Sequence, residues 1–213
     1  MLSSCPTEHV LAALQSDGSF VTCSNSTDQY DHHCVRYSSS VSTELSSGVT
    51  SIFSTNCAFA AVKSDGSVVT WCYHLYGGDS ISVSSFLNFD VTEIYSSYSA
   101  FAALKSDGSV VTWGESGGDS SSVSSELSSG VIEIYSTYSA FAALMSNGSV
   151  VTWGASSCSG ISAVGAGDSS SVSAELSCGM VSIFSTEHAV AAIKYGGSVL
   201  TWVYANNEDE DIF

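Results

Sequence analysis

Apolar and polar segments alternate along the whole chain, and the apolar segments are near-copies of one another. The clearest pair reads FAALKSDGSVVTW from Phe101 and FAALMSNGSVVTW from Phe141. Related copies begin at Leu11, Phe59 and Val190, so the unit occurs five times at spacings of 40 to 49 residues. A period of this length is typical of repeat architectures, in which each unit buries its apolar surface against its neighbours.

Each unit predicts three antiparallel strands and a connector. Asp-Gly or Asn-Gly between two apolar segments is a strong hairpin signal, and Gly108 and Gly148 would supply the positive φ of the turn. A further strand precedes four of the hairpins, such as VIEIYST from Val131, whereas the first unit lacks this strand motif. In the connector, Val123 and Leu127 lie four residues apart, which predicts one short helical or 3₁₀ turn.

A three-stranded sheet cannot bury both of its faces alone, so successive units must stack. Pairs of Ala at 102–103 and 142–143 suit a close approach of neighbouring sheets. The sequence therefore predicts an all-β fold of about five three-stranded blades, in a closed ring or an open arc. The expected units lie near residues 1–37, 38–78, 79–118, 119–167 and 168–205, and residues 206–213 form an acidic tail.

One unit shows the full motif of a known repeat. GVIEIYSTYSAFAALMSNGSVVTWG, from Gly130, contains Gly-Val, a strand, an Ala/Leu-rich strand, Asn-Gly and a strand ending in Trp-Gly. This pattern resembles the repeats of the RCC1-like family, and the short period and connector are most similar to the compact repeats of beta-lactamase inhibitory protein II. The resemblance covers nearly the whole chain and implies an RCC1-like β-propeller. It implies no single function, because RCC1-like propellers act as nucleotide-exchange factors, parts of ubiquitin ligases, light receptors and enzyme inhibitors.

Trp and Cys residues are interpreted as structural. The four Trp, at positions 71, 113, 153 and 202, share one unit position and are expected to be core or blade-edge residues rather than a chromophore. The seven Cys are irregularly spaced and form no Cys-x-x-Cys pair, which predicts mostly free, buried thiols. One bridge between equivalent loops is the open alternative.

The charge balance restricts the partners. Charged residues make up only 12% of the chain, yet the net charge is −17 because Lys and Arg number four. Nucleic acids need basic side chains at their phosphates, so we expect no nucleic-acid partner; other protein subunits with a basic patch are favoured. No apolar run is long enough for a transmembrane segment, and no signal peptide is visible. A removed targeting segment stays open, so no compartment is predicted.

Length changes between the units fall in one loop, the one that follows the strand ending in Trp. From this strand end to the connector Val, the third unit spans ten residues, whereas the first, second and fourth span 18, 12 and 19. Insertions in repeat proteins usually map to one face, which is often the binding face. We therefore expect partner contacts from these loops.

The first and second loops hold the candidate binding residues. Tyr and Arg are frequent interface anchors, and the first loop contains the only Arg of the chain. A metal site and a plain solvated loop are the alternatives for its His, Cys and Asp, but adjacent His side chains of an extended segment point to opposite sides. The residues expected to bind a partner are Tyr30, Asp31, His32, His33, Arg36, Tyr37, His74 and Tyr76.

Neither the repeated Asp residues nor any sequence motif indicates a catalytic site. Asp79, Asp119 and Asp168 share one unit position, where they are expected to cap the following turn, since one oxygen ligand per blade is too few for Ca²⁺. No phosphate loop, dinucleotide fingerprint or hydrolase motif occurs. We expect no catalytic residues, no metal and no cofactor.

Taken together, these features predict a non-catalytic protein-binding propeller, an accessory or scaffold subunit of a larger assembly. The alternatives are a soluble inhibitor or regulator that caps an enzyme with its loop face, and an enzyme with a site on that face.

Overall fold

The computed structural model describes residues 3–6, 10–14, 20–24, 41–115, 117–155 and 169–203, with β1–β3 and residue 203 placed through their backbone. Within these residues the strands form five three-stranded antiparallel sheets, each with its strands in sequence order, so the predicted all-β fold of about five blades is confirmed. The expectation that the first unit lacks a first strand is wrong, because Ser3–Pro6 pairs with Leu11–Leu14 through its backbone without the motif of the other units. We name the sheets blades 1 to 5. Their strands are β1 (Ser3–Pro6), β2 (Val10–Leu14) and β3 (Phe20–Ser24); β4 (Val49–Ser54), β5 (Ala58–Lys63) and β6 (Val68–Cys72); β7 (Val91–Ser96), β8 (Ala100–Lys105) and β9 (Val110–Gly114); β10 (Val131–Ser136), β11 (Ala140–Met145) and β12 (Val150–Gly154); β13 (Met180–Ser185), β14 (Ala189–Lys194) and β15 (Val199–Val203).

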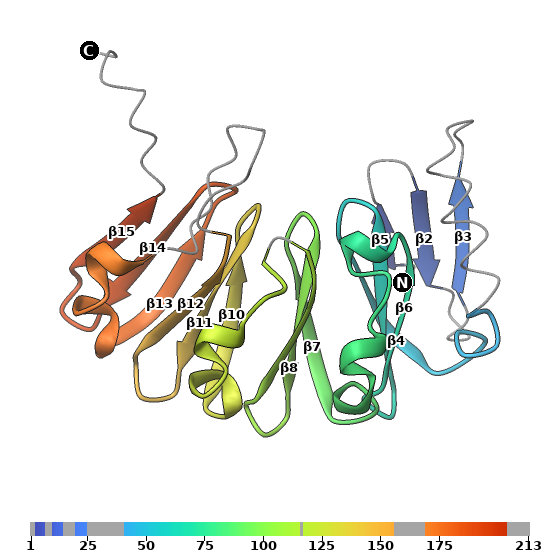
Figure 1. Cartoon of the computed structure of the whole chain (residues 1–213), viewed down its shortest axis with the longest axis horizontal. Helices are drawn as coiled ribbons and strands as arrows, with labels where there is room; N and C mark the ends of the chain where they lie inside the picture. The colour runs from blue at the N-terminus through green and yellow to red at the C-terminus, as the bar shows by residue number, and fades with distance from the viewer. Residues whose placement is uncertain are drawn as a thin grey trace, which may run out of the picture.

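The blades lie side by side in an open row (Figure 1), with blade 1 at one end and blade 5 at the other. First strands of neighbouring blades contact each other, as β4 does β7 and β10 does β13. The third strands instead contact the connectors, as β9 does η2 (Ile81–Phe86) and β12 does η3 (Ser121–Val123). The first strands therefore lie where the sheets converge, and the connectors fill the wedges where the sheets diverge.

The hairpins between second and third strands form as the sequence predicts. In blade 3, the C=O of Lys105 accepts the Gly108 N–H at 2.9 Å, and Gly108 has φ +77°. A Cβ on Gly108 would lie 2.8 Å from the backbone N of Gly130 in the next blade. Glycine is needed there both for its backbone conformation and for the close approach of the next blade.

Alternating residues of each middle strand pack on opposite neighbours. We call the side of a blade that packs on the next blade its forward face and the other side its backward face. Blade 4 packs its forward face on the backward face of blade 5 in one buried cluster. The forward face of blade 4 consists of Tyr135, Ala142, Leu144 and Val150, and the backward face of blade 5 consists of Ile183, Val190, Ala192 and Trp202.

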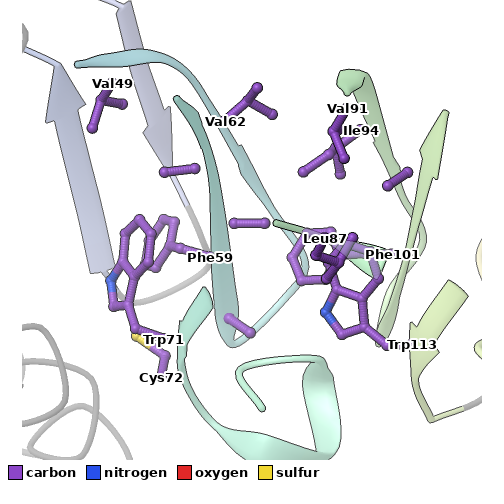
Figure 2. Close-up of a cluster of buried hydrophobic side chains, with 14 of the residues drawn as sticks. Val49, Phe59, Val62, Trp71, Cys72, Leu87, Val91, Ile94, Phe101 and Trp113 are labelled. Atoms are coloured by element: carbon purple, nitrogen blue, oxygen red, sulfur yellow. The ribbon is translucent and has the colours of Figure 1, made fainter. Parts of the chain in front are cut away.

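Each Trp is a core residue, as expected. Trp113 is 3% exposed and stacks on Phe101, with ring centroids 5.3 Å apart. Figure 2 shows this pair and the equivalent pair Phe59–Trp71 on corresponding faces of neighbouring blades, with Leu87 beside the Phe101–Trp113 pair. The Ala residues of β5, β8 and β11 are fully buried, which confirms that small residues allow the close approach of the sheets.

The connectors contain short 3₁₀ turns, as the Val–Leu spacing predicts. In the connector before blade 4, η4 (Glu126–Ser128) follows η3 and carries the buried Leu127. The equivalent turns before blade 5 are η5 (Ser170–Val172) and η6 (Glu175–Ser177). Among the described residues, Cys57, Cys72 and Cys178 are thiols; Cys72 is buried as expected, whereas Cys57 is partly buried and Cys178 is exposed.

Candidate functional site

The row of blades has two distinct edges. At one, which we call the loop edge, lie the ends of the third strands, the loops that follow them, and the turns between first and second strands. At the other, the hairpin edge, lie the turns between second and third strands. The predicted binding residues belong to the loop edge, and of these His74 and Tyr76 are described. Tyr30, Asp31, His32, His33, Arg36 and Tyr37 lie outside the described residues.

The second loop forms one 3₁₀ turn, η1 (His74–Tyr76), which ends at Gly77 with φ +92°. The extra residues of this loop place the exposed His74 at its start and Tyr76 at its end. The C=O of Tyr76 accepts a hydrogen bond from the Thr55 hydroxyl at 2.9 Å, which ties the loop to the β4–β5 turn of its own blade.

Tyr76 is part of a row of aromatic rings that crosses from blade 2 to blade 4. Its ring centroid lies 5.5 Å from that of Tyr73 and 5.6 Å from that of Tyr98. Tyr98 in turn stacks on Tyr138, with centroids 4.4 Å apart and an angle of 18° between the ring planes. All four rings are partly exposed. We call Tyr73, Tyr76, Tyr98 and Tyr138 the tyrosine row.

Hydrogen bonds between blades hold this row in place. The N–H of Asn56 donates to the C=O of Tyr98 at 3.0 Å, and the N–H of Tyr98 donates to the C=O of Tyr138 at 2.9 Å. The Asn56 side-chain amide also donates to the Tyr98 hydroxyl at 3.1 Å. The tyrosine row therefore rests on backbone that is fixed from one blade to the next, which limits the loss of freedom when a partner binds.

Packing and burial also set the protonation of Tyr76. Burial, followed by the neighbouring Tyr98, raises the pKa of Tyr76 to about 12. Tyr76 is therefore neutral at physiological pH and presents its hydroxyl as both donor and acceptor. Acid–base chemistry near neutral pH would need a group that titrates there, and this Tyr does not.

The second loop is anchored on the next blade through Gly77. The C=O of Gly77 accepts a hydrogen bond from the Trp113 indole N–H at 2.9 Å. A Cβ on Gly77 would lie 2.6 Å from the Phe101 ring, so only glycine fits between the loop and the aromatic pair. The loop is thus part of the packed structure, which makes it a rigid platform for its two exposed residues, His74 and Leu75.

A groove of about 590 Å³ runs beside this loop, between blades 2 and 3. His74 and Leu75 line one side of it, and the carboxylates of Asp79, Glu115 and Asp119 contribute negative charge. Leu75 is 37% exposed at the groove. The groove combines apolar and acidic surface next to the tyrosine row.

Charge is distributed unequally between the two edges. Lys63, Lys105 and Lys194 are all the lysines of the chain, and each ends a middle strand at the hairpin edge. At the loop edge, the described charged residues include Glu115 and Glu187 and no Lys or Arg. The loop edge therefore favours a positively charged partner surface.

The repeated Asp residues cap turns where the structure describes them. Asp79 accepts the N–H of Ile81, and Asp119 accepts the N–H of Ser121, both at 2.9 Å. Hydrogen bonds from Ser121 also hold the pKa of Asp119 below its usual value. Asp168 lies outside the described residues. The described residues contain no group of three or more His, Cys, Asp or Glu that could hold a metal ion.

Sequence reasoning identified Tyr76 but missed Tyr73, Tyr98 and Tyr138. The signal for two of them was present, because Tyr98 and Tyr138 share one unit position in adjacent units and must therefore become neighbours. Glu187 holds this position in blade 5, so the row ends at Tyr138; Asn56 holds it in blade 2, where Tyr76 of the following loop continues the row instead.

Comparisons with solved structures establish the class of fold. The chain is similar to Prp20p from Saccharomyces cerevisiae, whose structure is described with its binding to Gsp1p and histones, with 13% identity, a TM-score of 0.53, and coverage of 93% of this chain and 56% of that one. It is also similar to the ectodomain of the receptor kinase CR4 from Physcomitrella patens, with 13% identity, a TM-score of 0.52, and coverage of 94% and 49%. The fold is that of an RCC1-like β-propeller.

The comparisons go no further than the fold. The chain spans about half the length of these solved structures. No family model and no curated protein matches the sequence. Within the described residues, no helix is long and apolar enough to cross a membrane.

Proposed function

We propose that this chain is a non-catalytic protein-binding β-propeller, an accessory or scaffold subunit of a larger protein assembly that holds its partner at the loop edge. The tyrosine row is the observation that carries this proposal. Tyr residues are enriched where proteins bind, because a ring with two side-chain torsions offers a large contact area at a small entropic cost. Here four such rings from two blades and one loop lie together and remain partly exposed.

The negative charge beside the tyrosine row indicates the charge of the partner surface. Carboxylates line the adjacent groove, while the lysines lie at the opposite edge. A protein with a basic patch would gain both from long-range attraction and from stacking of Arg on exposed Tyr rings. The first-loop residues Tyr30 to Tyr37 extend the same surface in this proposal.

Similar folds support protein binding as the role. A structure of Kap60 bound to yeast RCC1 (Prp20) matches this chain with 11% identity and a TM-score of 0.51, and covers 93% of this chain and 55% of that one. The resemblance to the compact repeats of beta-lactamase inhibitory protein II supports the second candidate, a regulator that caps an enzyme with the loop edge. Both candidates use the same surface.

The test compares tagged wild-type protein with the double variant Tyr76→Ala/Tyr98→Ala by size-exclusion chromatography of an extract from the native source, with mass spectrometry across the fractions. We expect the wild type to co-elute with a defined protein, and the variant to lose that protein by about 30-fold or more, as for interface anchors. A large complex indicates the scaffold role, whereas one enzyme bound at equal stoichiometry indicates the regulator.

The control is Tyr195→Ala, because Tyr195 is 89% exposed at the hairpin edge. This variant should keep the partner, and circular dichroism should show that both variants fold. Retention of the partner by the double variant, or its loss from the control, would contradict binding at the loop edge.

A further inference from the structure

Blade 5 has a forward face that no described residue covers. In blades 3 and 4 the middle strands alternate between two neighbours and are buried on both sides, whereas β14 is buried only at Val190 and Ala192. On its forward side, Phe184 is 57% exposed and Val199 is 56% exposed. Ala191 and Ile193 are partly exposed between them.

The residues on this face are those that bury the other interfaces. Phe184, Ala191, Ile193 and Val199 hold the register positions of Tyr135, Ala142, Leu144 and Val150, which pack against blade 5. An exposed sheet face that keeps this apolar pattern is unusual for a surface that stays in water. The pattern indicates that the face is covered by a sheet of the same kind.

At both ends of the face, backbone groups that have no hydrogen-bond partner among the described residues indicate the same occupant. At the loop edge, the N–H of Tyr138 donates to the C=O of Glu187 at 2.8 Å, and this series of hydrogen bonds ends there in the described residues. At the hairpin edge, the N–H of Met180 donates to the C=O of Gly148 at 2.8 Å, and the equivalent C=O of Gly197 accepts no such bond from a described residue. A further blade would supply one acceptor and one donor at these two places.

The space at the hairpin confirms that this position is open. A Cβ on Gly148 would lie 3.1 Å from the backbone N of Gly179, but a Cβ on Gly197 would meet nothing within 4 Å. Gly197 keeps φ +82°, so the hairpin itself has the same shape as those that contact a following blade. The hairpin of blade 5 therefore has both the conformation and the open space that contact with a following blade requires.

We propose that the forward face of blade 5 binds the backward face of blade 1 of a second copy of this chain. The blade 1 of the same chain lies at the other end of the row (Figure 1) and does not cover it. By register, Leu11 takes the position of Phe59 and Ala13 that of Ala61, so the pattern of a backward face is kept in β2 although no described sheet precedes it. The contact repeats the interface that joins blade to blade within the chain, and it is heterologous, so copies add head to tail.

The first measurement is sedimentation velocity of the purified full chain from about 1 to about 100 µM, the range in which an interface of moderate affinity dissociates. We expect species larger than the monomer that grow with concentration. Phe184→Glu should weaken this association by about 30-fold or more, because it places a charge in an apolar contact. Val199→Lys is the second variant at the same face. A wild type that remains monomeric throughout the range would overturn the proposal.

The matched control is Ile132→Glu. Ile132 is 57% exposed, as Phe184 is, but it lies on the first strand of blade 4, away from the open face. The control should associate like the wild type. An equal loss of association in the control would show non-specific apolar contact and overturn the proposal.

A mixing experiment separates head-to-tail binding from a symmetric dimer. The variants Phe184→Glu and Leu11→Glu should each be monomeric alone, with Ala13→Glu as the substitute if Leu11→Glu does not fold. Mixed in equal amounts they should form a one-to-one dimer, because each retains the face that the other lacks. If Leu11→Glu alone still dimerises and the mixture gains nothing, two forward faces bind each other and the head-to-tail arrangement is wrong.

Discussion

Blades 4 and 5 have nearly the same backbone and very different surroundings. The middle strand of blade 4 is buried along its whole length, while that of blade 5 is buried only at Val190 and Ala192. Val150 is 8% exposed in blade 4, and Val199 at the same position is 56% exposed in blade 5. The sheet itself therefore forms from its local sequence, and its burial comes from the neighbour.

This difference separates two contributions to folding stability, one from within a sheet and one from its neighbours, which cannot be separated in most proteins. In a repeat fold, stability is close to a sum of terms within each unit and terms between neighbouring units. Blade 4 is stabilised by contacts with a preceding and a following blade, whereas blade 5 is stabilised only by contact with the preceding blade in the described structure. Paired substitutions at equivalent positions therefore measure the contact between blades directly.

The largest expected effect comes from the middle strands. Leu144→Ala should lower the free energy of unfolding by about 2–5 kcal/mol, because Leu144 is 4% exposed and packs against blade 5. Ile193→Ala at the equivalent position should cost about 1 kcal/mol or less when measured in the monomer. Urea denaturation followed by Trp fluorescence measures both. Equal losses would mean that Ile193 is covered even in the monomer.

A smaller difference is expected at the hairpin glycines. Gly148 and Gly197 have φ of +78° and +82°, so Ala at either position should cost about 1–2 kcal/mol from the backbone alone. Gly148→Ala adds the close contact with the backbone N of Gly179 at 3.1 Å, so it should cost more than Gly197→Ala. Thermal unfolding of the two variants checks the order. A larger loss for Gly197→Ala would contradict an open hairpin in blade 5.

A gain of stability is expected where the tyrosine row ends. Glu187 holds the unit position of Tyr98 and Tyr138, so Glu187→Tyr should stack on Tyr138 and stabilise the chain by about 0.5–1.5 kcal/mol. The control Glu175→Tyr, an exposed position in η6, should change little. Chemical denaturation measures both variants. An equal gain in the control would show that stacking is not the cause.

The smallest expected effect is a change in the pH dependence of stability. Burial, followed by the hydrogen bond to Glu133 at 2.6 Å, raises the pKa of Tyr135 to about 12. Because the folded chain holds this proton more tightly than the unfolded chain, whose Tyr ionises near pH 10, the stabilising contribution is complete below about pH 10 and is lost as the pH rises towards 12.

Tyr135→Phe should therefore reduce the loss of stability between about pH 10 and 12. Phe184→Tyr at the equivalent position on the open face of blade 5 should add much less pH dependence in the monomer, because it lacks both the neighbouring blade that buries Tyr135 and a carboxylate partner, since Ser182 holds the position of Glu133. Urea midpoints measured across this pH range test the pair. A gain of pH dependence in Phe184→Tyr as large as the loss in Tyr135→Phe would show that the neighbouring blade does not cause the shift.

The sequence by itself determined the strands, the hairpins and the repeat. The repeated apolar segments, the Asp-Gly or Asn-Gly between them, and the Trp at the strand end are local signals, and each acts within one unit. Gly108, Leu127 and Trp113 accordingly have the conformation or burial that their positions in the repeat predict. Tyr76 was identified from a two-residue insertion, which is also a local signal.

Only the tertiary structure decided what each face and each loop contacts. The tyrosine row requires Tyr76 to lie 5.6 Å from Tyr98, which depends on how one blade is rotated against the next. The exposure of Phe184 and Val199 likewise depends on whether a neighbour is present and not on any feature of β13 or β15. The hydrophobic pattern of a strand indicates which of its sides needs to be buried. Burial, however, requires a second surface, and the sequence of the strand does not specify which surface that is.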